Sequence, residues 1–282
     1  MEQKRYITRQ VVRKKRTLKL WVWIVLLIIF LLLFLLCVIN LFFWKVDSSK
    51  TKNILDDLNK DTNIVEIEDN DKTENINEPE DPLSDYWYYI KFPLIDVNFS
   101  ELKLKNEETV GWINVNNTNI NYPFVQTDNN EFYLNHSFDK TYNEAGWVYL
   151  DYRNKKNFTD RNTIIYAHSR LDKTMFGSLS KVLKESWYKD KNNHIIRIST
   201  ETENTLWQIF SVYVIDTETY YITTNFINDN EYSEFLNTIS SRSIYDFNTE
   251  LSIDDRILTL STCYSDTQKT VVHAKLIKKE NK

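Results

Sequence analysis

The sequence predicts a mainly β protein that follows a single membrane-spanning helix. An almost unbroken apolar run covers residues 20–44, and the last two thirds of the chain contain short strand-like segments separated by polar turns. Many short strands with polar turns are typical of a β-barrel or a β-sandwich. With 282 residues, of which 42% are hydrophobic and 27% charged, the chain has room for one substantial globular domain and accessory segments.

The apolar run is long enough to cross a bilayer as one helix. At a rise of about 1.5 Å per residue it covers a hydrocarbon core of roughly 30 Å with some tilt, and its terminal tryptophans suit membrane interfaces. Residues 1–19 are rich in Lys and Arg, whereas the flank after Trp44 is acidic. The positive-inside rule therefore predicts a cytoplasmic tail and an extracellular body. A cleaved signal peptide is the alternative, but the run is longer than a usual signal core and no small-x-small site follows it, so we expect an uncleaved signal anchor.

The basic tail is also compatible with nucleic-acid binding, but its position beside the apolar run makes membrane topology the simpler explanation. The formal net charge is -5, and the chain beyond the tail is more acidic still. This charge gives no electrostatic footprint for nucleic acid, and we expect no such partner.

The segment after the span, residues 45–83, is rich in Asp, Asn, Glu, Lys and Thr. We expect an acidic flexible linker there, helical at most around residues 54–58. The extracellular folded body then occupies residues 84–282.

The body is expected to begin with two helices. Tyr86 starts the first, and the second contains Phe99 and Val110 and ends at Gly111. Strands are expected at residues 120–125, 146–150, 163–166, 195–199, 206–215, 256–262 and 271–277.

One longer helix is expected at Asn228–Ser240, in the connection before the last two strands. Its apolar residues recur at i, i+3, i+4 and i+7, and Asn228 with Glu231 resembles a capping box. Such a stripe is typical of core packing. The apolar residues are Tyr232, Phe235, Leu236 and Ile239.

The two cysteines lie in different solvents and cannot pair. Cys37 is inside the apolar span, and Cys263 ends the strand expected at residues 256–262. In that strand Leu258 and Leu260 share one face, whereas Cys263 falls on the other. A lone cysteine usually belongs to the core, but an unpaired thiol in an exported domain points to intermolecular pairing or reactivity.

A thiol nucleophile needs an acid or base partner, and the chain has four histidines. His136 and His194 lie among polar residues, where surface roles are expected, and His273 lies within the last strand. His168 follows the strand expected at residues 163–166, and catalytic groups concentrate where strands give way to loops. A lone histidine is usually structural, so its position alone leaves both interpretations of His168 open.

Several motifs resemble one known family. Thr259-Leu260-Ser261-Thr262-Cys263 followed by Val271-Val272-His273-Ala274-Lys275-Leu276 is similar to the active-site end of a sortase, and so is Ile164-Ile165-Tyr166-Ala167-His168-Ser169. The resemblance extends to Gly111-Trp112-Ile113, Asn121-Tyr122-Pro123-Phe124-Val125-Gln126 and Gly146-Trp147-Val148-Tyr149-Leu150-Asp151. It covers the chain from about Ser84 to the C-terminus, and the N-terminal helices and the helix before the cysteine strand resemble class B.

The resemblance implies a closed barrel of about eight strands and a cysteine transpeptidase that attaches secreted proteins to the Gram-positive cell wall. Cys263 would attack the carbonyl after the threonine of a C-terminal sorting signal and form a thioester. His168 would protonate the leaving amine and then deprotonate the amine of a peptidoglycan precursor. The expected partners are secreted proteins with a sorting signal, an amine acceptor and the membrane, and no metal or other cofactor is implied.

One position departs from the family pattern. Where the family has an arginine shortly after the cysteine, this chain has Lys269, which keeps the positive charge but loses the planar fork of donors. Lys269 replaces the arginine in one interpretation. In the other it is a solvated surface charge, and Arg170, Arg256 or backbone N–H groups assist the reaction.

The resemblance also implies substrate contacts from Tyr166, Thr217, Tyr221, Ile222, Ser261 and Asn130. Ordinary barrel packing is the alternative for each of them. Three other functions stay open at this point: a degenerate sortase fold used as a surface binding or assembly module, a pilin-polymerising sortase, and a secreted cysteine protease.

Overall fold

The structure, a computed structural model, describes residues 19–282. The basic tail expected at residues 1–19 therefore lies outside the described residues except for Lys19. The chain divides into an N-terminal unit that ends at Lys45 and a compact unit, Val46–Lys282. Helix α1 (Leu20–Asp61) contains the apolar run, and within the described chain it is the one helix long and apolar enough to cross a membrane.

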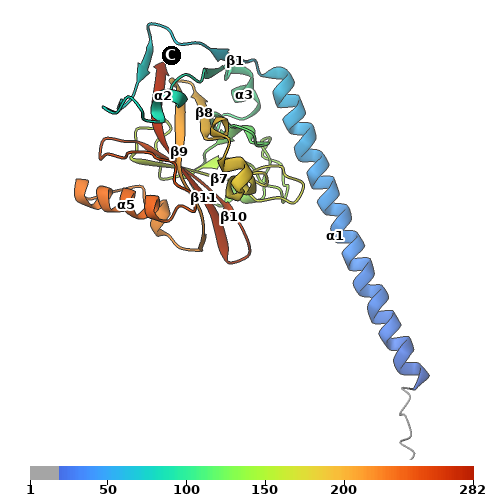
Figure 1. Cartoon of the computed structure of the whole chain (residues 1–282). Coiled ribbons are helices and arrows are strands. Elements are labelled where there is room, and N and C mark those ends of the chain that lie inside the picture. Colours follow the sequence, from blue (N-terminus) through green and yellow to red (C-terminus); the bar gives the residue numbers. More distant parts are fainter. Residues whose placement is uncertain (1–18) are drawn as a thin grey trace, which may run out of the picture. The chain divides into compact units, whose positions relative to one another are not determined.

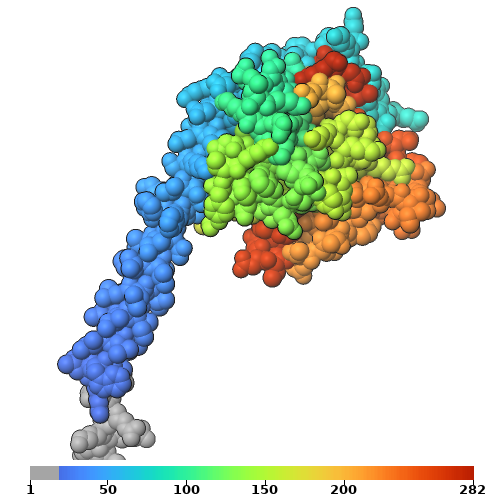
Figure 2. Space-filling model, turned by 180° about the vertical axis from the view of Figure 1, so that it is seen from behind, coloured from blue at the N-terminus to red at the C-terminus, as the bar shows by residue number. Residues whose placement is uncertain are grey.

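The compact unit is built on a closed β-barrel, which confirms the predicted fold class. Its eight strands follow the order β10-β7-β6-β5-β4-β8-β9-β11, and pairing of β10 with β11 closes the ring (Figure 1). The bounds are β4 (Thr109–Val115), β5 (Asn121–Val125), β6 (Tyr149–Leu150), β7 (Asn162–Tyr166), β8 (Ile195–Thr200), β9 (Glu203–Asp216), β10 (Ile257–Cys263) and β11 (Gln268–Asn281). The long strand β11 crosses the whole unit, so red segments lie at two opposite edges of the body in Figure 2.

Short helices surround the barrel and one longer helix packs against it. Helix α5 (Asp229–Ser241) begins as predicted, because the Asn228 side chain accepts a hydrogen bond from the Glu231 N–H. Its four apolar residues are buried with Phe210 of β9 and Ile257 of β10, which confirms core packing. The other helices are α2 (Tyr86–Tyr89), α3 (Ser100–Lys105), α4 (Glu185–Tyr188) and the 3-10 turns η1 (Phe132–Leu134), η2 (Leu179–Leu183), η3 (Lys191–Asn193) and η4 (Tyr220–Ile222).

The second predicted helix is shorter than expected. It ends at Lys105, and Val110 and Gly111 belong to strand β4. Gly111 lies opposite Phe124 of β5, and a Cβ atom there would lie 2.5 Å from the Phe124 ring and 2.7 Å from the Ser199 carbonyl oxygen. The glycine therefore permits close approach of strands and is not a helix cap.

The segment expected to be a linker contains regular structure. Helix α1 continues to Asp61, and its Thr51 and Leu58 side chains are buried. Beyond it, β1 (Ile64–Ile67) pairs with β3 (Leu94–Val97), and β2 (Thr73–Asn75) extends the barrel edge along β11. Polar composition concealed these elements because their few apolar side chains pack against partners distant in the sequence.

Candidate active site

The thiol of Cys263 lies at the rim of the barrel, at the turn between β10 and β11. The N–H groups of Tyr264 and Ser265 donate to the Gln268 carbonyl and close this turn. Cys263 is thereby paired directly with Lys269 across the hairpin. The Nζ atom of Lys269 lies 3.1 Å from the Cys263 Sγ atom, and the cysteine side chain is exposed.

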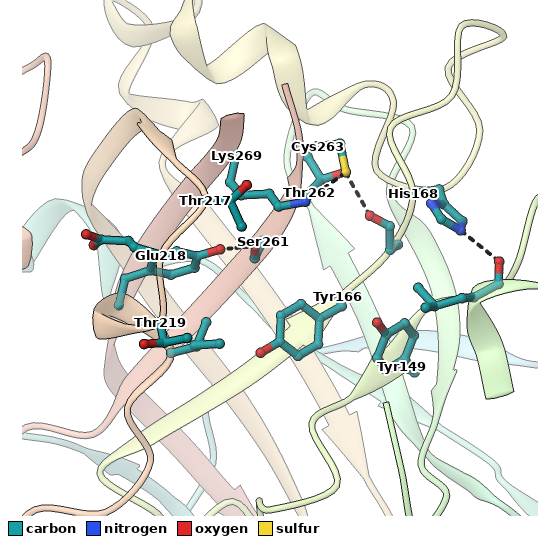
Figure 3. A pocket seen from close by; sticks show the side chains of 14 residues that line it. Tyr149, Tyr166, His168, Thr217, Glu218, Thr219, Ser261, Thr262, Cys263 and Lys269 are labelled. Carbon is teal, nitrogen blue, oxygen red and sulfur yellow. Dashed lines mark hydrogen bonds between the residues drawn. The ribbon is translucent and has the colours of Figure 1, made fainter. Parts of the chain in front are cut away.

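His168 reaches the same edge from the neighbouring strand. Strands β7 and β10 run parallel, and their last paired residues are Tyr166 and Ser261. His168 and Cys263 each follow two residues later, and the Thr262 hydroxyl donates to the Ala167 carbonyl at 2.7 Å between them. The Nε2 atom of His168 is 2.7 Å from the Leu134 carbonyl oxygen (Figure 3).

A cavity of about 360 Å³ opens beside these three side chains. Tyr149 and Tyr166 line it from β6 and β7, and the loop after β9 supplies the facing wall (Figure 3). The lining residues are Leu134, Tyr149, Tyr166, Ala167, His168, Thr217, Glu218, Thr219, Tyr221, Ile222, Ser261, Thr262, Cys263 and Lys269.

The tyrosines of the cavity are held in their neutral form. Burial raises the pKa of Tyr149, and burial together with the Asp151 charge raises the pKa of Tyr166. Burial also raises the pKa of Tyr221, whose hydroxyl is hydrogen-bonded to the Ser261 hydroxyl at 3.0 Å. The cavity therefore offers aromatic surface and neutral hydroxyl groups beside the charged Lys269, a lining that suits a peptide chain.

Eight of the nine residues singled out from the sequence line this cavity. They are Cys263, His168, Lys269, Tyr166, Thr217, Tyr221, Ile222 and Ser261. Asn130 does not line it. Its side chain donates to the Asp151 carboxylate and accepts from the Tyr152 N–H, so Asn130 supports the region behind the cavity.

Six lining residues had no separate signal in the sequence. Glu218, Ala167 and Thr262 adjoin predicted residues, and Thr219 lies two residues from Thr217 and from Tyr221, so proximity in the sequence pointed to all four. Tyr149 lies in a motif that carries the family resemblance. Leu134 comes from the turn η1, whose approach to His168 depends on tertiary packing.

The other candidate cations lie elsewhere. Arg170 forms an ion pair with Asp172 and donates to the Ser48 hydroxyl. Arg256 donates to the Phe158 carbonyl and forms an ion pair with Glu203. Among the described residues, Lys269 is the cation that lines the cavity.

The remaining histidines have structural partners. The expectation of a surface role for His194 is wrong, because it is 3% exposed and hydrogen-bonded to the Tyr89 hydroxyl and the Tyr188 carbonyl. His273 is fully buried between Thr259 and Tyr213, and burial lowers its pKa to about 3. His136 stacks on the Phe132 ring.

The comparisons with known proteins agree on one family. The family model described as "Sortase domain" matches residues 113–277. Sortase B of Staphylococcus aureus (strain NCTC 8325 / PS 47) is 38% identical over 184 residues, which cover 64% of this chain and 75% of that protein.

Solved structures give the same result. A Staphylococcus aureus sortase B–substrate complex matches with a TM-score of 0.60 and 38% identity, over 64% of this chain and 84% of that one. A sortase B complexed with triglycine matches with a TM-score of 0.61 and 36% identity, over 64% and 85% of the two chains.

Proposed function

The chain belongs to the sortase family, as a class B sortase and cysteine transpeptidase, and we propose that it cleaves a C-terminal sorting signal after threonine and transfers the shortened protein to a cell-wall amine. The observation that carries this proposal is the convergence of Cys263, Lys269 and His168 at one end of adjacent strands, beside a single cavity. A thiol beside an imidazole and a cation has the groups needed for acyl transfer through a thioester.

In the first half-reaction the Cys263 Sγ atom attacks the threonine carbonyl carbon. The carbon–nitrogen bond breaks, a carbon–sulfur bond forms, and His168 gives its proton to the leaving amine. In the second half-reaction the acceptor amine attacks the thioester, His168 takes its proton, and the thiolate leaves. The proton that His168 gives up in the first step is recovered from the acceptor amine in the second, and the energy of the first amide bond is retained in the new one.

The Leu134 carbonyl supports one orientation of the His168 ring. A carbonyl oxygen accepts hydrogen bonds and cannot donate them, so the Nε2 atom, 2.7 Å away, carries a hydrogen. The Nδ1 atom is then the nitrogen that exchanges a proton with the reacting amines. This bond holds one tautomer of the neutral ring and steadies the ring when it is charged.

Lys269 takes the position of the family arginine in this proposal. Its ammonium nitrogen lies 3.1 Å from the sulfur, so its charge would lie beside the carbonyl group that Sγ attacks and would stabilise the oxyanion that forms there. A lysine presents a compact charge and no bidentate fork, so stabilisation of the oxyanion depends on charge more than on geometry.

The family and helix α1 support a proposal for the acceptor and the location. One matching structure is described as sortase B complexed with triglycine, which supports a glycine-type amine as the acceptor. We place the body outside the cell and the basic tail in the cytoplasm, with the apolar part of α1 as a single-pass anchor.

The test is product analysis with the full chain in detergent micelles. A library of peptides with varied sorting signals is incubated with excess triglycine, and the products are separated and weighed. The expected product is an amide between the fragment that ends in threonine and triglycine, absent with Cys263→Ala. Carboxylic acid in excess of amide at saturating triglycine, or no cleavage at all, would contradict the transferase proposal.

A further inference from the structure

An ion pair between the buried Asp151 and the partly exposed Arg153 adjoins the cavity through Tyr166. Asp151 follows strand β6, and its side chain is fully buried. The Nε and Nη2 atoms of Arg153 donate to its two oxygens at 2.9 and 2.7 Å. The Tyr166 hydroxyl donates to the same carboxylate at 2.9 Å, so the pair is tied to one side of the cavity.

The carboxylate is charged although it is buried. Burial alone would raise the pKa of Asp151, but the hydrogen bonds from Arg153 and Tyr166 lower it overall. A buried carboxylate with this many donors is held in one position, and loss of the Arg153 guanidinium would leave a buried charge without its ion-pair partner.

Arg153 is also hydrogen-bonded to the loop after β9, which forms the opposite wall of the cavity. Its Nη2 atom donates to the Ile222 carbonyl at 3.0 Å. Asn162, fully buried in β7, donates to the carbonyls on either side, Tyr221 at 3.2 Å and Thr223 at 2.9 Å. Three successive carbonyls of the loop after β9 are therefore held by two side chains, one from the turn after β6 and one from β7.

We propose that Asp151 and Arg153 are positioning residues that fix the width of the cavity, which is the proposed substrate groove. They do so because they join Tyr166 on one side of the cavity to Ile222 on the other. Neither side chain lines the cavity, so both act through residues that do. A loop held at a fixed distance is pre-organised for its ligand, which lowers the entropy lost on binding. This inference rests on the proposed function, because it assigns the groove to the sorting signal.

The test compares Arg153→Gln and Arg153→Lys in the full chain, in detergent micelles, with one sorting-signal peptide and triglycine. The lysine variant keeps a positive charge beside Asp151, but its single ammonium cannot hold both carboxylate oxygens and the Ile222 carbonyl. The matched control is Arg161→Gln, which removes an arginine from the partly exposed Arg161–Asp229 pair outside the cavity. The rate of Cys263 alkylation by iodoacetamide reports the reactivity of the thiol and does not require binding of the peptide.

Both Arg153 variants should raise KM for the peptide on the order of tenfold, with kcat and the alkylation rate within about threefold of the parent. Unchanged KM in the lysine variant, or a fall in kcat and alkylation rate without a change in KM, would overturn the inference. If Arg153→Gln fails to fold, the KM of Arg153→Lys alone tests the inference. An inactive parent protein contradicts the proposed function itself and is recognised before any variant is measured.

Discussion

Lys269 lies directly across the β10–β11 hairpin from Cys263, and its ammonium nitrogen is 3.1 Å from the cysteine sulfur. The position that departs from the family pattern therefore still places a positive charge beside the nucleophile. The distance follows from the short turn, because Tyr264 and Gln268 close it and leave Cys263 and Lys269 as a directly opposed pair.

The first prediction concerns this charge. Lys269→Met keeps the length of the side chain and removes the ammonium, so kcat/KM for transpeptidation should fall about 10²-fold, as for other oxyanion donors. Lys269→Arg should keep or increase the parent activity because the charge stays and a second donor is added. Lys52→Met, on an exposed face of α1, is the control and should leave kcat/KM unchanged. Full activity in Lys269→Met would show that the charge is not used.

The second prediction is a pH dependence of stability that originates at His273. Its pKa is about 3 in the folded protein because of burial, against an ordinary value of 6.5. The unfolded chain therefore binds the extra proton between these values, and the contribution of this group to stability is fully present only well above pH 6.5 and is lost as the pH falls toward 3. The loss between pH 6.5 and pH 5 should be about 2 kcal/mol from this group.

Urea denaturation of His273→Gln at both pH values checks the assignment. The variant should lose less stability than the parent over that interval, whatever its stability at neutral pH. Equal losses in the two proteins would assign the pH dependence to other groups.

The third prediction concerns the part of α1 that belongs to the compact unit. Leu58 is 1% exposed and packs in the main core, so Leu58→Ala should lower the free energy of unfolding by about 2–5 kcal/mol. Leu104→Ala, at a side chain that is 81% exposed, should change it by less than about 0.5 kcal/mol. Urea titration of both variants provides the measurement, and a neutral Leu58→Ala would mean that this turn of α1 does not pack on the barrel in solution.

The fourth prediction concerns the close packing of β4 against β5 and β8 at Gly111. Gly111→Ala places a Cβ atom against the Phe124 ring and the Ser199 carbonyl, which have no space for it. Overpacking of this kind should cost about 1–3 kcal/mol of stability. Thermal unfolding followed by circular dichroism gives the value, and an unchanged melting temperature would contradict the tight packing of β4 on β5 and β8.

Helices and strands were predicted correctly where the local sequence pattern agrees with the tertiary structure. The alternation in residues 256–262 placed Cys263 correctly at a strand end, and the capped stripe that starts at Asn228 predicted α5. His168 was found by its position after a strand, but its proximity to Cys263 depends on the parallel pairing of β7 with β10, which no local pattern contains.

Predictions from the sequence were wrong where contacts between residues distant in the chain determine the local structure. Gly111 appeared to be a helix cap and is instead a point of close contact between strands. The polar surroundings of His194 concealed a buried site between Tyr89 and Tyr188. The distance between Lys269 and Cys263 depends on the register of one hairpin, so the sequence left the role of that lysine open.

Intact-mass spectrometry of the full chain mixed with a sorting-signal peptide tests whether Cys263 forms an acyl-enzyme. We expect an adduct on Cys263 with the mass of the peptide fragment that ends in threonine, formed without triglycine and released as an amide when triglycine is added. Cys263→Ala should give neither adduct nor amide, and His168→Gln should form the adduct far more slowly. Amide formation without an adduct, at the same rate in Cys263→Ala as in the parent, would contradict it.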